Sequence, residues 1–153
     1  MNKLVFTSYQ SIANASQKKI VTSLQTQNEF KENGDWIVTE KIHGANYSLW
    51  TNGVDVIPGR RSGFIMDEKG FFKSTAIREK YEDRVRSLFN EFPGAKSVGV
   101  FGELFGGFYP GYPKTVPMIQ KGVNYCPGHE FYAFDISVDR SYVLPKRSLR
   151  HSR

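Results

Sequence analysis

The alternation of apolar and polar residues predicts strands on both sides of a short basic turn. Residues 36–40, Trp-Ile-Val-Thr-Glu, predict a strand, because β-branched and aromatic residues dominate a run too short for a helix. Residues 46–51 alternate as a half-buried strand does. Asn52 and Gly53 then predict a two-residue type I′ turn into a second strand over residues 54–57.

A helix and two further strands are predicted in the second half of the chain. From residue 74 to residue 92, apolar side chains recur every three or four positions, and Pro93 with Gly94 ends the pattern. That helical stripe consists of Ile77, Tyr81, Val85, Leu88 and Phe92. Residues 96–104 and 130–138 are apolar runs of strand length, separated by a loop rich in Gly, Pro and Tyr at residues 106–117.

These elements indicate an α+β fold with mainly antiparallel sheets and packed helices. A short helix is also predicted over residues 17–24, with Asn14 or Ser16 as its cap. We divide the chain into an N-terminal lead-in segment, a folded part and a basic tail, at residues 1–35, 36–138 and 139–153.

The composition, 39% hydrophobic and 24% charged, is typical of a packed globular chain. No secretory signal and no run of about 18 apolar residues occurs, so we expect neither secretion nor a membrane partner. The single Cys126, together with His129, gives only two zinc ligands, too few for a zinc site. A lone cysteine also favours a reducing compartment, cytoplasmic by default, with the nucleus and organelles left open. The net charge of +6 favours a polyanionic partner, although many basic proteins bind no nucleic acid.

Lys41 stands in the run Glu-Lys-Ile-His-Gly-Ala-Asn at residues 40–46. Gly44 permits a tight turn and a close approach of the backbone to a ligand. A P-loop is excluded, because no G-x-x-x-x-G-K-[ST] pattern occurs. Taken alone, such a lysine is most often a solvated surface charge.

The run at residues 40–46 closely resembles nucleotidyltransferase motif I of the ATP-dependent RNA ligase family typified by the phage enzyme that seals nicks in duplex RNA. Related DNA ligases and capping enzymes generally have aspartate where His43 stands, so His43 points to the RNA-ligase branch. The basic segment Arg-Arg-Ser-Gly, motif III Phe-Gly-Glu and motif IIIa Phe-Tyr-Ala-Phe-Asp-Ile follow in family order, at residues 60–63, 101–103 and 131–136. Residues 119–126 also resemble the family.

The resemblance implies the N-terminal portion of a nucleotidyltransferase adenylation domain, which is ATP-grasp-like, and covalent catalysis by Lys41. Its amine would attack the α-phosphate of ATP, expel pyrophosphate and hold AMP. AMP would then pass to an RNA 5′-phosphate, and a 3′-hydroxyl would displace it to form a 3′–5′ phosphodiester. The expected cofactors are ATP and Mg²⁺, with no metal ligand predicted on the chain itself. The expected partner is RNA with 5′-phosphate and 3′-hydroxyl ends, for which a nicked duplex is one possibility. The implied process is RNA repair.

The resemblance also assigns roles to other residues. Glu103 would hold the ribose hydroxyls, Phe134 would stack on adenine, and Arg61 would neutralise phosphates. Supporting roles toward the lysine, the nucleotide or a metal-bound water are implied for Glu40, His43, Asn46 and Asp135. Structural alternatives remain: Phe134 as a core aromatic, Glu40 and Asp135 as satisfied carboxylates, Asn46 as a turn residue and His43 as a packed or solvent-facing histidine.

Complete family members continue with a glutamate-bearing motif IV and a Lys-x-Lys motif V, and neither pattern follows Asp135 here. We therefore expect a truncated or split ligase, with a missing C-terminal part and a tail over residues 139–153 that is a non-native end. The missing lysines would have lowered the pKa of Lys41 and neutralised the phosphates of ATP. Without them, adenylation is expected to be impaired. The alternatives are a noncatalytic nucleic-acid-binding remnant and, less favoured because of His43, a DNA ligase or capping guanylyltransferase relative.

Overall fold

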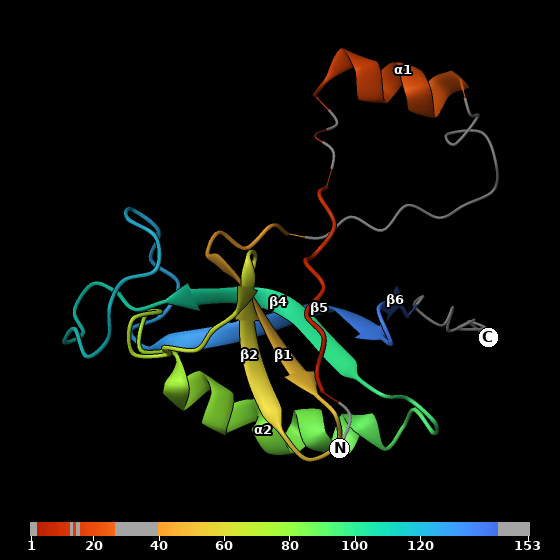
Figure 1. The fold of residues 1–153 in the computed structure, drawn as a ribbon. Coiled ribbons are helices and arrows are strands. Elements are labelled where there is room, and N and C mark those ends of the chain that lie inside the picture. Colours follow the sequence, from red (N-terminus) through yellow and green to blue (C-terminus); the bar gives the residue numbers. More distant parts are fainter. Residues whose placement is uncertain (1–2, 13, 15, 27–39, 144–153) are drawn as a thin grey trace, which may run out of the picture. The chain divides into compact units, whose positions relative to one another are not determined.

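The computed structural model describes residues 3–12, 14, 16–26 and 40–143, in two compact units (Figure 1). One unit, Tyr9–Lys41, contains helix α1 (Lys18–Thr26), which confirms the predicted short helix with a shift of one to two residues. Before α1, the Asn14 Oδ1 atom accepts a hydrogen bond from the Ser16 backbone N–H at 2.9 Å. Of the strand predicted over residues 36–40, residues 36–39 lie outside the described residues, and Glu40 is in no strand.

The other unit, Met1–Ser8 with Ile42–Arg153, is the sheet unit. Its six strands form one antiparallel sheet in the order β3-β2-β1-β4-β5-β6. The strands are β1 (Ala45–Thr51), β2 (Val56–Arg60), β3 (Gly63–Phe64), β4 (Val98–Gly106), β5 (His129–Val138) and β6 (Ser141–Tyr142). With helix α2 (Thr75–Phe89), this sheet confirms the predicted α+β class.

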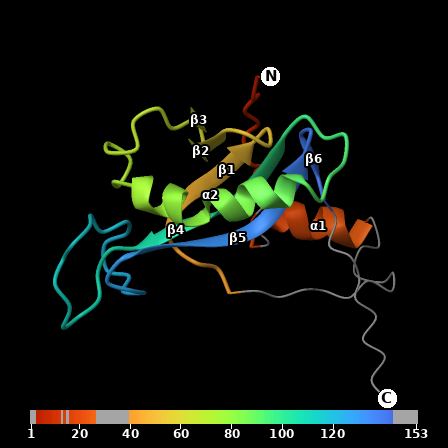
Figure 2. The same ribbon diagram turned by 90° about the horizontal axis from the view of Figure 1, so that it is seen from below.

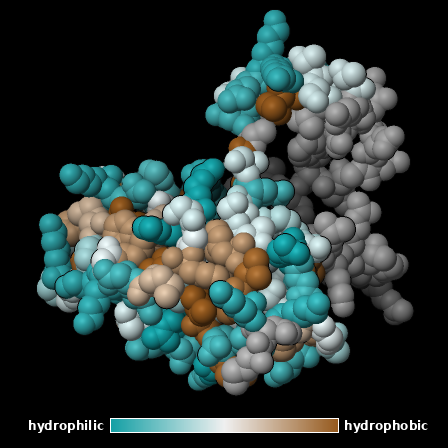
Figure 3. Space-filling model, in the orientation of Figure 1, coloured by the Kyte–Doolittle hydropathy of each residue, from teal (hydrophilic) through white to brown (hydrophobic). Residues whose placement is uncertain are grey.

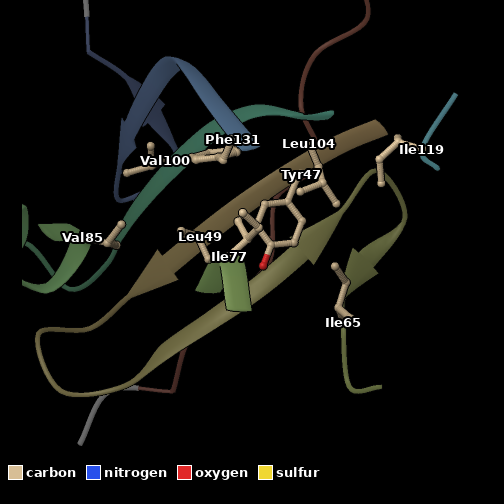
Figure 4. Packing of buried hydrophobic residues seen from close by; sticks show 9 residues of the cluster. All are labelled: Tyr47, Leu49, Ile65, Ile77, Val85, Val100, Leu104, Ile119 and Phe131. Carbon is tan, nitrogen blue, oxygen red and sulfur yellow. The ribbon is translucent and has the colours of Figure 1, made fainter. Parts of the chain in front are cut away.

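One face of the sheet packs against α2, which runs across β1, β4 and β5 in Figure 2. The core between them consists of Tyr47, Leu49, Ile65, Ile77, Val85, Val100, Leu104, Ile119 and Phe131 (Figure 4). Burial raises the pKa of the Tyr47 phenol, so this side chain stays protonated inside the core. At the rim, the Lys80 ammonium pairs with the Glu130 carboxylate at 2.6 Å and joins α2 to β5. The helix and the sheet thus share one apolar core on this face.

On the opposite face of the sheet, an aromatic cluster covers one end. There Trp50 is fully buried, and its ring contacts Phe6, Phe64 and Phe101 at centroid distances of 5.7, 6.2 and 5.3 Å. Phe6 comes from the N-terminal segment, whose Leu4 is also buried. Figure 3 shows hydrophobic residues gathered in the middle of the sheet unit and hydrophilic residues around them. This aromatic cluster stabilises the end of the sheet where β1 finishes and β4 begins.

The helix predicted over residues 74–92 and the strands predicted after Lys41 are confirmed in kind, with shifted ends. α2 ends three residues before Phe92, because the N–H groups of Asn90, Glu91 and Phe92 bond to carbonyls three residues earlier, not four. Pro93, which has no N–H, follows this tightened turn. The stripe still packs as predicted, with Ile77 and Val85 buried. The two short strands β3 and β6 were not predicted, since two-residue strands carry no periodicity. No helix in the described part of the chain has the length and apolarity that crossing a membrane requires.

The predicted type I′ turn at Asn52 and Gly53 is wrong. Thr51 pairs with Val56, so four residues connect β1 to β2, and Asn52 does not have the positive φ that this turn requires. Instead, the Asn52 Oδ1 atom accepts hydrogen bonds from the backbone N–H groups of Val54 and Asp55 at 3.1 and 2.9 Å. The side chain thus stabilises a wider turn, as Asn commonly does.

A two-residue turn of the type I′ kind occurs instead between β5 and β6. Val138 pairs with Ser141, and the two residues between them, Asp139 and Arg140, have φ of 48° and 73°. The Asp139 Oδ1 atom also accepts hydrogen bonds from the backbone N–H groups of Lys96 and Ser97, at 2.9 and 2.8 Å, and these bonds lower the pKa of its carboxyl. This carboxylate holds the start of β4 beside the turn.

Replacing Arg140 by glycine is expected to raise the free energy of unfolding by about 0.5 kcal/mol. Left-handed backbone costs an L-residue about 1–2 kcal/mol, whereas glycine adopts it freely and loses part of the gain to unfolded-state entropy. Urea unfolding of Arg140→Gly beside wild type measures the change. Arg84→Gly, within α2, is the control and should lose about 1 kcal/mol. An unchanged or lowered stability of Arg140→Gly would contradict the turn.

Candidate functional site

The open end of the sheet face opposite α2 carries polar residues in register across three strands. Asn46 of β1 pairs with Glu103 of β4, and Glu103 pairs with Tyr132 of β5. Paired residues of antiparallel strands place their side chains on the same face. Asp135 pairs with Phe101, two residues before Glu103, and so lies on this face about 7 Å further along the sheet. The structure therefore brings together three residues that the sequence predicted, Asn46, Glu103 and Asp135.

Phe134 is placed by a β-bulge. On β5, Ala133 pairs with Gly102 and Asp135 pairs with Phe101, which leaves Phe134 between them as the additional residue. A bulge bends the strand and redirects the side chain of the unpaired residue. The Phe134 side chain is 43% exposed, so the alternative that it is a core aromatic is wrong. The exposed Phe134 thus stands on β5 between Asp135 and Tyr132, the residue that pairs with Glu103.

The turn that leads into β1 is held by Glu103. The Gly44 backbone N–H donates a hydrogen bond to the Glu103 Oε1 atom at 3.0 Å. A Cβ atom at Gly44 would lie 2.1 Å from the Leu104 carbonyl oxygen and 2.9 Å from Glu103 Cγ, so only glycine fits. The glycine of the predicted motif is therefore required for close contact between this turn and β4.

Two residues from the loop between β4 and β5 hold the same turn from the other side. The Gln120 side-chain amide donates to the Gly44 carbonyl at 2.7 Å, and the Tyr125 hydroxyl accepts from the His43 backbone N–H at 3.0 Å. The Tyr125 ring packs edge-on against Phe105, with centroids 5.4 Å apart. Sequence reasoning assigned neither residue a role, although both lie in the stretch 119–126 that resembles the family. His43 contributes its backbone to the site, and its side chain is exposed.

Arg61 lies in the two-residue turn between β2 and β3 and is exposed. Because Arg60 pairs with Tyr47 near the start of β1, this turn and the Gly44 turn lie at the same end of the sheet. Glu40 and Lys41 are the last residues of the Tyr9–Lys41 unit, outside helices and strands, and are described apart from the sheet. The sheet unit itself therefore contains six of the eight predicted residues.

The Cys126 thiol and the His129 imidazole both contact backbone carbonyls of the loop between β4 and β5. No group of three or more His, Cys, Asp and Glu side chains in those residues is arranged to hold a metal ion. Cys126 donates to the Gly128 carbonyl at 3.2 Å, burial raises the pKa of its thiol, and the His129 Nε2 atom lies 2.6 Å from the Pro117 carbonyl oxygen. Both side chains thus stabilise the base of the loop between β4 and β5.

Comparison with known proteins identifies the family. A family model described as RNA ligase matches residues 34–150, which include every motif named above. The mitochondrial RNA-editing ligase 2 of Trypanosoma brucei brucei (strain 927/4 GUTat10.1) is 30% identical over 155 aligned residues. The match covers 86% of this chain and 36% of that protein, so the chain spans little more than a third of the relative. Because the family match extends over well over half of the chain, and its motifs meet at one end of one sheet, the chain belongs to the RNA ligase family.

Proposed function

We propose that the sheet unit binds the adenosine of ATP on the face opposite α2, and that Lys41 receives AMP in the first step of RNA ligation. The observation that supports this most strongly is the hydrogen bond from Gly44 to Glu103, which joins motif I to motif III beside the bulge at Phe134. Lys41 precedes Gly44 by three residues, so the extended backbone between them spans at most about 11 Å. That reach suffices to bring a long side chain to a nucleotide on this face.

Glu103 and Phe134 would hold the nucleoside. One Glu103 oxygen accepts from Gly44, and a carboxylate can accept further hydrogen bonds from ribose hydroxyls. The exposed Phe134 ring offers a face on which adenine stacks. Asp135 and Asn46 border the same area and would position the lysine amine or a water. Each role agrees with the position of the residue on the sheet.

Lys41 would act as the nucleophile. Its neutral amine forms a bond to the α-phosphorus of ATP, the bond to the bridging oxygen breaks, and pyrophosphate leaves while the amine loses a proton. An RNA 5′-phosphate oxygen then displaces the lysine, and a 3′-hydroxyl displaces AMP to form the phosphodiester. Arg61, at the same end of the sheet, would neutralise phosphate charge, and Glu40 would help to position the lysine.

Mg²⁺ fits the proposal as a metal that accompanies ATP. It usually binds substrate phosphates, keeps several waters and needs only one or two carboxylates, so no preformed protein cage is required. Asp135 and Glu103 are the carboxylates on the proposed nucleotide face. When bound, the metal would neutralise the charge that develops on the phosphates.

Incubation with ATP and Mg²⁺, followed by intact-mass analysis, tests the role of Lys41. We expect an AMP adduct on wild-type molecules and none on Lys41→Ala, because Lys41, three residues before Gly44, is the proposed nucleophile. Lys69→Ala, an exposed lysine in another loop, is the control and should behave as wild type. An adduct on Lys41→Ala would refute the assignment.

Calorimetric titration with AMP tests the nucleoside site independently of catalysis. Glu103→Ala should weaken binding about tenfold or more, because hydrogen bonds to charged groups contribute roughly 1.5–3 kcal/mol. Phe134→Ala should weaken it at least about fivefold through loss of stacking, while Phe134→Tyr keeps the ring and should bind normally. Glu91→Gln, an exposed glutamate after α2, is the charge control. If Glu103→Ala and Phe134→Ala bind AMP as wild type does, the site lies elsewhere.

The Gly44 turn provides a further test, because Gln120 would act by positioning it. Gln120→Ala removes the hydrogen bond to the Gly44 carbonyl but leaves Glu103 and Phe134 in place. We expect adduct formation to slow about three- to tenfold, consistent with a hydrogen bond of roughly 0.5–1.5 kcal/mol, with AMP affinity changed less than about twofold. A parallel loss of AMP affinity would show that Gln120 binds the nucleotide directly or that the variant is misfolded.

A further inference from the structure

The loop between β4 and β5, residues 107–128, is anchored at its base and projects beyond the ends of both strands (Figures 1 and 2). The Gly107 backbone N–H donates to the Gly128 carbonyl at 2.8 Å, and the Ile119 N–H donates to the Gly106 carbonyl at 3.1 Å. Ile119 is buried in the core. The base of the loop therefore has a defined position relative to the sheet.

The outer part of the loop displays two tyrosines on a tight turn. In Tyr109-Pro110-Gly111-Tyr112, the Tyr112 N–H donates to the Tyr109 carbonyl at 3.2 Å, and Gly111 has φ 85°. Proline followed by a glycine of positive φ is the pattern of a type II turn. The two rings contact each other edge-on with centroids 6.0 Å apart, and they are 43% and 59% exposed. The turn thus presents two accessible aromatic rings at little conformational cost.

The charge of this loop is entirely positive. Between Glu103 and Glu130 the sequence contains no Asp or Glu, but it contains Lys114 and Lys121, both exposed. The Lys114 ammonium lies 5.0 Å from the centroid of the Phe108 ring, so aromatic and cationic groups are interleaved. Stacking rings beside lysines are what single-stranded nucleic acids require, because bases stack and phosphates pair with cations.

We propose that this loop, with Tyr109, Tyr112 and Lys114 as its main contacts, binds single-stranded RNA and holds a substrate end beside the Gly44 turn. The proposal rests on the proposed ligase function for the identity of the nucleic acid. Its geometric support is that Gln120 and Tyr125 of the same loop hydrogen-bond to Gly44 and His43. The loop that would bind the RNA is therefore the same loop that holds the turn after Lys41.

Fluorescence anisotropy with a fluorescein-labelled single-stranded RNA of about 12 nucleotides, a length within the range of such sites, tests the proposal on the 153-residue chain. The double variant Tyr109→Ala/Tyr112→Ala should weaken binding at least about fivefold, because stacking contributes roughly 1–3 kcal/mol per base. Lys114→Ala should reduce the slope of log affinity against log salt by about 0.7, the value for one phosphate contact. Met66→Ala and Lys69→Ala, both in the loop before α2, are the matched controls and should bind as wild type.

Circular dichroism and AMP titration on the same variants separate this inference from the proposed function. The variants should keep the wild-type spectrum and AMP affinity, since the substituted side chains are exposed and lie in the loop outside the paired strands that carry Glu103 and Phe134. RNA binding that is absent in wild type, or unchanged in both loop variants, overturns the inference even where AMP binds normally. If AMP binding is absent while RNA binding depends on the tyrosines, the proposed function fails and the RNA surface stands.

Discussion

β1 and β4 pair in a register that sets Asn46 beside Glu103 and Ala45 beside Leu104, and the candidate site depends on this pairing. The register brings the Gly44 N–H to the Glu103 carboxylate, which is possible only because glycine has no Cβ to collide with the Leu104 carbonyl. A shift of one residue would turn Glu103 toward the core and remove the hydrogen bond. Stability of the sheet and geometry of the site thus have the same cause.

The two faces of the sheet differ in what they contain. The face under α2 buries a continuous apolar core, in which burial raises the pKa of the Tyr47 phenol and keeps it protonated. On the other face, Trp50 and its aromatic neighbours close one end, while Glu103 and Phe134 lie at the end that stays accessible. The bulge at Phe134 lies between these two ends of the face, and it changes which side chains of β5 point to each face of the sheet.

The loop between β4 and β5 contacts the candidate site with its inner residues and solvent with its outer residues. Its inner residues Gln120 and Tyr125 hold the backbone of the Gly44 turn, and its outer residues carry exposed tyrosines and lysines. In the proposed ligation scheme, one part of this loop would position the turn after Lys41 and another part would bind the RNA. This arrangement would let a single loop set the distance between the adenylated lysine and the strand to be joined.

The sequence by itself determined the family, the α+β class and the strands and helix with strong periodicity, because motif I and the stripe through Ile77 and Val85 are local patterns. The tertiary structure decided what depends on pairing between distant segments. Asn52 forms a wide turn through its side chain, Phe134 is exposed by a bulge, and Gln120 reaches a turn 76 residues earlier in the chain. Local preferences cannot specify register, bulges or such long-range hydrogen bonds, since these are fixed only when strands pack together.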